Sequence, residues 1–155
     1  MKQHNRSIVT LCMAAAVMAG VLTVREAAAV TGTLVLTDNT EIQGDISWFA
    51  SSREYNVSSA SVSRKVPLRQ VNRVIVAKPA QFDAAVQAVQ GHRYAAAVKP
   101  LEAIVKSYEM MQWDVMAARF LAEAYLSLNQ AGKAVEMSER IIRVIARLRY
   151  RGSDV

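Results

Sequence analysis

The spacing of apolar residues changes once along this chain, and that change limits the fold more than any other feature. From Thr31 to Ala77 apolar and polar residues alternate, which is typical of strands with one buried face. After Pro79 the apolar residues recur every three or four positions, as they do along one face of a helix. A run of strands followed by a run of helices predicts an α+β fold.

Five short strands are predicted in the first part of the chain. The segment from Glu41 to Trp48 alternates most regularly, and the residues before it, Asp38-Asn39-Thr40, favour a tight turn. Short antiparallel strands with brief turns predict a small β-barrel over residues 30–77. The strands are expected at Thr33 to Thr37, at Glu41 to Trp48, around Tyr55 and Val57, around Val62 and Val66, and from Val71 to Val76.

Two antiparallel helical hairpins are predicted over residues 78–155. The breaks between their helices are short, which favours neighbours that run in opposite directions. Pro100 removes a backbone donor, so it is expected either to kink its helix or to mark the effective start. The predicted helices begin after Pro79, at Tyr94 (to Tyr108), at Trp113 (to Leu128) and at Ala131 (to Tyr150).

Small residues recur at matching places in the two hairpins; Ala97 and Ala134, for example, lie 37 residues apart. Alanine lets two helix backbones approach closely. With the stretch "LAEAYLSLNQAGKAVEMSERII", this spacing resembles the tetratricopeptide repeat (TPR) over residues 79–149. The resemblance implies a helical solenoid with a concave surface that binds peptides or proteins. The residues that would line this groove are Phe82, Val86, Val89, Met116, Arg119, Glu123 and Leu126.

Two details limit what the resemblances imply. Some TPR proteins hold a peptide carboxylate with Asn, but Val86 and Glu123 occupy the matching places here, so that clamp is not expected. The predicted barrel loosely resembles the Sm-like and SH3-like small barrels through "LTDNT" and Gly44-Asp45-Ile46. Ala50-Ser51 and "NRVIVA" replace the residues with which Sm-like proteins bind RNA, so nucleic acid is not an expected partner.

The first 29 residues are predicted to be an export signal. A charged start is followed by an apolar run from Ile8 to Val24 and by small residues at Ala27 and Ala29, and cleavage is expected after Ala29. The alternative is an uncleaved N-terminal anchor, because the apolar run is long and Arg25-Glu26 interrupts it. Both alternatives place the rest of the chain outside the cytoplasm, in the periplasm or cell envelope of a bacterium.

No residue pattern in the chain indicates catalysis, a metal site or a cofactor. The single cysteine lies in the export segment, and His92 is the only histidine beyond it, whereas a zinc or iron site needs three or four ligands. The carboxylates of the helical part are spaced as ion pairs on helix surfaces. The chain is therefore predicted not to be an enzyme. Bulky residues at helical or strand spacing are interpreted as core: Trp48, Met110, Met111, Trp113, Met116 and Met137.

The last predicted helix carries two features of interest. One face forms a basic stripe of Arg140, Arg143, Arg147 and Arg151, which is either solvated or binds an anionic lipid or cell-wall polymer. The other face carries Ile141, Ile145 and Leu148 with no capping helix after it. These apolar residues are expected either to pack onto the predicted barrel or to contact another chain, including a second copy.

These observations favour an exported scaffold or adaptor without catalytic activity, which binds a protein or peptide partner through TPR-like helices. The alternative is attachment to an anionic envelope surface through the basic stripe. The expected organisation is an export segment (1–29), a small β-barrel (30–77) and a helical domain (78–155).

Overall fold

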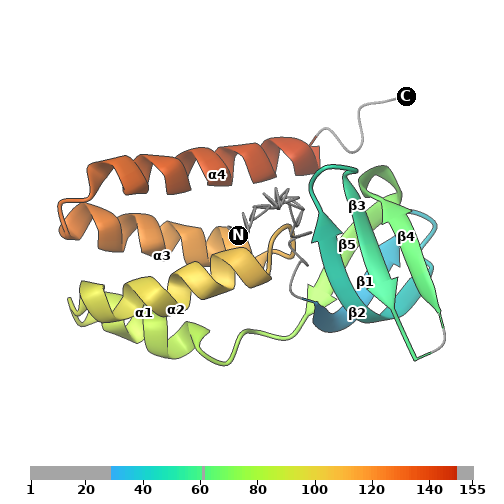
Figure 1. Ribbon diagram of the computed structural model, residues 1–155, viewed down its shortest axis with the longest axis horizontal. Helices are drawn as coiled ribbons and strands as arrows, with labels where there is room; N and C mark the ends of the chain where they lie inside the picture. Colours follow the sequence, from blue (N-terminus) through green and yellow to red (C-terminus); the bar gives the residue numbers. More distant parts are fainter. Residues whose placement is uncertain (1–28, 61, 150–155) are drawn as a thin grey trace, which may run out of the picture.

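The computed structural model describes residues 29–60 and 62–149 and shows an α+β protein, a five-stranded antiparallel sheet followed by four helices (Figure 1). The predicted export segment, apart from Ala29, lies outside the described residues. The sheet has the strand order β4-β3-β2-β1-β5. Its elements are β1 (Val30–Leu36), β2 (Glu41–Phe49), β3 (Glu54–Ser58), β4 (Ser63–Pro67), the 3₁₀ turn η1 (Leu68–Gln70) and β5 (Val71–Val76).

The prediction of a closed barrel is wrong, because β4 and β5 are the two edges of an open sheet. Only the turn Leu68–Gln70 connects these edges. A flat sheet of five strands is roughly 19 Å wide, since strands lie about 4.8 Å apart. Four peptide steps span at most about 14 Å. The sheet must therefore curl to bring its edges together. The turn forms backbone hydrogen bonds to other loops: Leu68 N–H donates to the carbonyl oxygen of Arg53, and Thr37 N–H donates to that of Gln70. No ladder of hydrogen bonds joins β4 to β5 within the described residues.

Glycines permit the close approach of strands in this curled sheet. Gly32 of β1 pairs with Gly44 of β2. A Cβ atom at Gly32 would lie 2.5 Å from the carbonyl oxygen of Ile75, and one at Gly44 would lie 2.5 Å from that of Ser58. Neither position has room for a side chain, so the pair marks a place where four neighbouring strands, β3, β2, β1 and β5, come unusually close.

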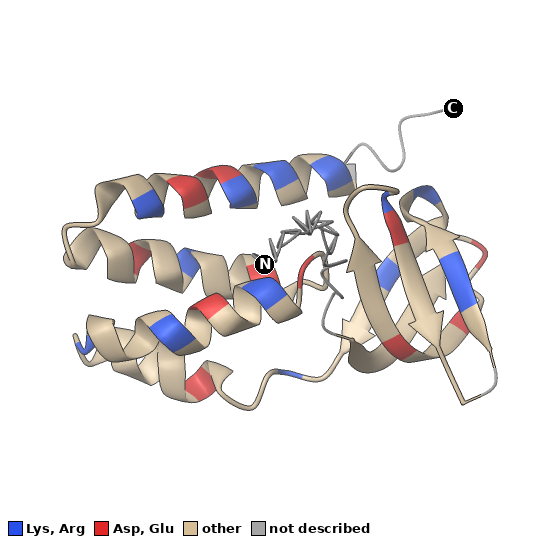
Figure 2. Ribbon diagram, viewed as in Figure 1, with Lys and Arg blue, Asp and Glu red and all other residues tan. Residues whose placement is uncertain are grey.

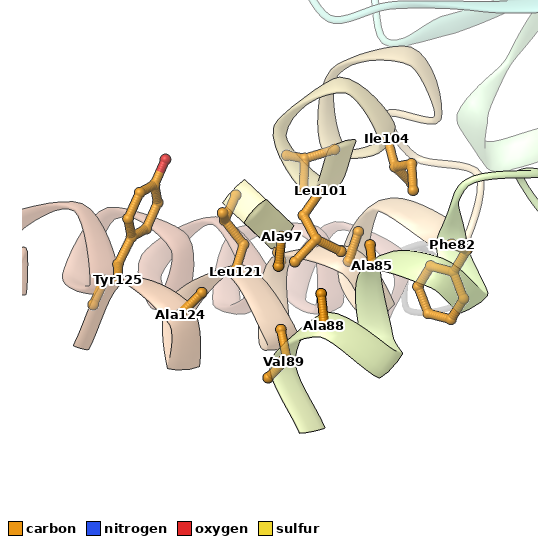
Figure 3. Packing of buried hydrophobic residues seen from close by; sticks show 14 residues of the cluster. Phe82, Ala85, Ala88, Val89, Ala97, Leu101, Ile104, Leu121, Ala124 and Tyr125 are labelled. Atoms are coloured by element: carbon orange, nitrogen blue, oxygen red, sulfur yellow. The ribbon is translucent and has the colours of Figure 1, made fainter. Parts of the chain in front are cut away.

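The four helices are α1 (Phe82–Gln90), α2 (Tyr94–Ser107), α3 (Trp113–Ser127) and α4 (Ala131–Arg149), and α2 continues through Pro100. Consecutive helices pack side by side and run in opposite directions (Figure 1). Their shared core contains many alanines: Ala85, Ala88, Ala97, Ala117, Ala118, Ala124 and Ala134 are all buried. In Figure 3 the small side chains Ala85, Ala88 and Ala97 lie between helices, with Leu101 and Leu121 beside them.

The sheet and the helices meet through the loop between α2 and α3. Met110 and Met111 in this loop, together with Val144 of α4, are buried in the core of the sheet. The hydroxyl of Tyr55 in β3 donates a buried hydrogen bond of 2.7 Å to the carbonyl oxygen of Met110. Trp113 donates to the carbonyl oxygen of Val76 over 3.4 Å. The two parts therefore pack against each other at this loop, and the predicted boundary near Lys78 separates strands from helices.

The loop has an unusual backbone that buried polar contacts hold in place. Met110 and Gln112 both have positive φ, at 61° and 73°, a region that residues other than glycine seldom adopt. The side chain of Asp114 is only 1% exposed, and its Oδ2 accepts a hydrogen bond of 2.9 Å from the N–H of Met110. Burial raises the pKa of Asp114 above its ordinary value, while the hydrogen bond from Met110 acts in the opposite direction. Asp114 thus fixes the turn that presents the two methionines to the sheet.

Candidate functional site

The residues predicted to line a groove divide into two groups. In α1, Phe82 is 7% exposed and Val89 is 2% exposed, and Val86 packs against the same helical core. The ring of Phe82 contacts those of Trp113 and Phe120, at centroid distances of 5.1 and 6.1 Å. The other helices therefore cover Phe82 and Val89, and the prediction that these two residues line an open groove is wrong. Val86 stays half-buried.

The second group lies at the surface of α3. Met116 is 37% exposed and Leu126 is 61% exposed, and Arg119 and Glu123 are exposed between them. Neither Arg119 nor Glu123 forms a side-chain ion pair or hydrogen bond within the described residues. We refer to Met116, Arg119, Glu123 and Leu126 as the α3 surface. It combines two large apolar side chains with two charges that are free to bind a partner.

The basic stripe is partly used for structure. Arg140 donates through Nη2 to the carbonyl oxygen of Val105 over 3.1 Å and lies 3.6 Å from Glu109, so it links α4 to the end of α2. Arg143 pairs with Glu139 at 3.3 Å. In Figure 2 the acidic residues of α4 lie in its first half, and the charged residues of the half nearer the sheet are all basic. Arg147 is half-buried, and Arg151 lies outside the described residues. The stripe is therefore not a row of free cations.

The apolar face at the end of α4 is partly covered by the protein itself. Ile141 packs against the helical core, and Val144 is buried in the core of the sheet. Ile145 and Leu148 stay partly exposed, and Val135 and Ile142 are more exposed still, at 56% and 66%. Packing against the helical core and the sheet thus covers one side of this helix, and Val135 and Ile142 remain exposed on the other.

A cavity of about 270 Å³ opens between α2, α3 and α4, and we call it the helical pocket. Arg140 joins α2 to α4 near the sheet, and the pocket lies further from the sheet along the same pair of helices. Its lining combines apolar and charged side chains: Glu102 and Val105 from α2, Leu121 and Tyr125 from α3, and Lys133, Glu136 and Met137 from α4.

Tyr125 is the central polar group of the helical pocket. Its hydroxyl donates a hydrogen bond to Oε1 of Glu102, and the residue as a whole is buried. Burial is the main cause that raises the pKa of Tyr125 above its ordinary value, followed by this hydrogen bond and the negative charges of Glu102 and Glu136. The ammonium of Lys133 lies 5.2 Å from the centroid of the Tyr125 ring, a cation–π distance. The phenol thus stays protonated and places its ring beside a positive charge.

The helical pocket and the α3 surface lie on opposite sides of α3. Leu121 and Tyr125 are four residues apart and share one face of the helix. Successive residues turn by about 100° around a helix, so Arg119 and Glu123 lie roughly 160° from Leu121. The residues predicted from the sequence therefore border a different surface from the cavity that the fold creates.

Other polar groups are placed as structural contacts. His92 Nδ1 and the Tyr94 hydroxyl lie 2.7 Å apart on the surface, and Lys78 pairs with Asp83 at 2.6 Å. Over the part of the chain that the structure describes, no group of three or more His, Cys, Asp or Glu residues is arranged to hold a metal ion. None of the helices described there has the length and apolar character needed to span a membrane.

The sequence did not predict the helical pocket. Glu102 and Glu136 belong to the carboxylates of the helical part, whose spacing is typical of helix surfaces. The i, i+4 spacing of Leu121 and Tyr125 signals a shared face, but only the fold brings that face against α2 and α4. Comparisons with family models, with curated proteins and with solved structures find no match for this chain.

Proposed function

We propose that this chain is an exported scaffold or adaptor that carries out no catalysis and binds a protein or peptide partner through TPR-like helices in the cell envelope. The observation that carries the proposal is the α3 surface. Two large apolar side chains stand exposed there on either side of two charges that have no ion-pair partner within residues 29–60 and 62–149. Protein interfaces commonly combine exposed apolar anchors with a few charged groups in this way.

The packing of the helices supports the TPR-like part of the proposal. Ala97 of α2, Ala118 and Ala124 of α3 and Ala134 of α4 are all buried where successive helices pack. The first helices of the two hairpins, α1 and α3, also contact each other. An array in which each hairpin stacks on the next is the arrangement expected of helical repeats. Such an array offers an extended surface to a partner.

The charged side chains support a binding role more than attachment through the basic stripe. Arg140 and Arg143 already pair with Glu109 and Glu139. Adsorption to an anionic surface relies on free cations and weakens as salt screens them. We therefore place the binding site on α3 and not along the arginines of α4.

The test is partner capture from envelope extract with the double substitution Arg119→Ala and Glu123→Ala. This change removes one cation and one anion and leaves the net charge unchanged. We expect the captured partner to bind at least about fivefold more weakly, the effect of losing roughly 1 kcal/mol at an interface. Crosslinking followed by mass spectrometry identifies the partner and its contact residues.

The matched control is the pair Glu139→Ala and Arg143→Ala on α4. It also removes one acid and one base four residues apart on an exposed helix face. We expect it to leave capture unchanged. Equal capture by both double variants, or a loss confined to the α4 variant, would contradict a binding site on the α3 surface.

A further inference from the structure

We propose that the helical pocket binds one organic cation, a guanidinium or ammonium group on an aliphatic stem, supplied by an arginine or lysine side chain of the partner. That a partner protein supplies the cation rests on the proposed function. That the pocket binds a cation rests only on the residues that line it. The site is separate from the α3 surface, because the two lie on opposite faces of α3.

The size of the pocket fits a single side chain. Pockets for drug-sized ligands and cofactors enclose roughly 300–1,000 Å³. The helical pocket encloses about 270 Å³. It is therefore too small for such a ligand as a whole but large enough for one long side chain that enters from an open mouth. A single residue of a docked segment is the occupant that fits.

The lining of the pocket matches the two halves of a basic side chain. Val105, Leu121 and Met137 supply apolar surface, against which the methylene stem of an arginine or lysine can pack. Glu102 and Glu136 come from different helices and supply two carboxylates. Glu102 accepts one hydrogen bond from Tyr125, and an ionised carboxylate has capacity for several more. An anionic occupant would instead face two like charges.

The protein already places a positive charge at this site. The ammonium of Lys133 lies beside the face of the Tyr125 ring, where the π electrons and the nearby carboxylates favour a cation. Lys133 is exposed and has a flexible stem, so it can move aside at little cost. We infer that Lys133 occupies the cation position in the free protein and competes with the side chain of the partner.

The experiment is a titration of the full chain with n-butylguanidinium, in which NMR measures the chemical shift of the Met137 methyl group. Neutral n-pentanol and anionic pentanoate are the controls, because each keeps an aliphatic stem but lacks the positive charge. We expect saturable shifts with the cation alone. Glu136→Gln should weaken binding about three- to fivefold, the effect of losing a partly exposed ion pair. Lys133→Ala should tighten binding, because it removes the competing cation.

The matched control is Glu123→Gln on the other face of α3, which removes an exposed carboxylate from outside the pocket. It should leave the affinity for n-butylguanidinium unchanged. The inference is overturned if n-pentanol shifts the Met137 methyl as strongly as the cation does, if no shift saturates, or if Glu123→Gln weakens binding as much as Glu136→Gln. Because no partner protein is present, failure here is distinct from failure of partner capture on the α3 surface.

A second titration identifies the source of the cation. The tripeptide acetyl-Ala-Arg-Ala-amide is compared with acetyl-Ala-Gln-Ala-amide, which lacks the charge. Saturable shifts of Met137 with the arginine peptide alone support a side chain of a partner. Binding of n-butylguanidinium without binding of the arginine peptide would show that the pocket takes a free small cation, and would overturn the assignment to a protein side chain.

Discussion

The helices and the sheet differ in how they complete their hydrophobic cores. Every residue of the helical core within the described chain comes from the helical part, from Phe82 to Ile141, and half of its fully buried positions are alanines. The core of the sheet consists of bulky residues such as Leu34, Ile46 and Trp48, and it is completed by Met110, Met111 and Val144 from the helical part.

This difference shows that the core of the sheet includes side chains of the helical part, whereas the helical core of the described chain includes none from the strands. The helices bury their apolar faces against each other, whereas the curled sheet needs side chains from the α2–α3 loop and from α4 to fill its interior. A sheet of fewer than 50 residues has little core of its own, since small domains bury a smaller fraction of their surface. Substitutions at the junction should therefore affect the strands more than the helices.

The largest effect is expected for Met111→Ala, which leaves a cavity at the centre of the junction. A buried methionine replaced by alanine typically costs about 2–5 kcal/mol in the free energy of unfolding. Urea denaturation followed by circular dichroism measures the loss, and amide hydrogen exchange should show that the strands lose more protection than α3. The control is Met116→Ala on the exposed α3 surface, expected to change stability by less than about 0.5 kcal/mol. Equal losses in strands and helices would break the comparison.

A smaller effect is expected from overfilling the helical core with Ala97→Leu. Ala97 is fully buried, so the extra methine and two methyl groups of leucine must push α2 away from its neighbours. Overpacking of this kind costs about 1–3 kcal/mol. Thermal denaturation measures it, with Ala103→Leu on the exposed face of α2 as the matched control. A stability for Ala97→Leu that equals the control would show that the helices do not pack as closely as their alanines indicate.

The hydrogen bond between the two parts is tested by Tyr55→Phe, which keeps the ring but removes the donor to Met110. Loss of one such bond costs about 0.5–1.5 kcal/mol. Tyr94→Phe is the control, because its hydroxyl contacts the exposed His92 at the surface. If the two variants unfold at the same urea concentration, the bond across the junction contributes nothing to holding the sheet on the helices.

The last prediction concerns the stability difference between Asp114→Asn and the unaltered protein. This difference is small at low pH and grows as the pH rises. Burial raises the pKa of Asp114 in the folded state above its ordinary value of 3.8. The folded protein then holds this proton more tightly than the unfolded chain does, so its contribution to stability is complete below pH 3.8 and is lost as the pH rises through the higher folded pKa. Asn cannot titrate, and its oxygen can still accept the bond from Met110.

Asp114→Asn should therefore gain stability relative to the unaltered protein as the pH rises through this window. Urea denaturation of both proteins at a series of pH values measures the difference, with Asp83→Asn on the exposed start of α1 as the control. A difference that stays constant with pH, or that falls as pH rises, would contradict the burial of an ionisable carboxyl group at the junction.

The sequence predicts the elements of this fold well, because the pattern of apolar residues follows local geometry. The strand Val71–Val76 has the predicted bounds, and the last three helices end within one residue of the expected positions. The interpretation of Trp48, Met110 and Met111 as core is confirmed, since all three are buried, whereas that of Met116 is wrong, since it is exposed on α3. Periodicity identifies the apolar face of an element, and most such faces are buried.

Periodicity does not say what covers an apolar face. The same spacing in α1 fits a groove or a core, and the structure places Phe82 and Val89 in the core. Whether β4 and β5 pair with each other depends on how strongly the sheet curls and on the turn that connects them. The alternation of apolar and polar residues encodes neither. The helical pocket combines residues from three helices, and no local pattern specifies such a meeting. Those features depend on tertiary packing, and sequence reasoning missed them for that reason.

The position of Met110 and Met111 has a mechanical consequence for the helical array. The loop that carries them joins the first hairpin to the second, and it is anchored in the interior of the sheet. A change in the angle between the hairpins would have to displace both methionines from their buried positions in the core of the sheet. The sheet therefore holds the first hairpin at a fixed angle to the second, and this keeps the shape of the helical surface constant.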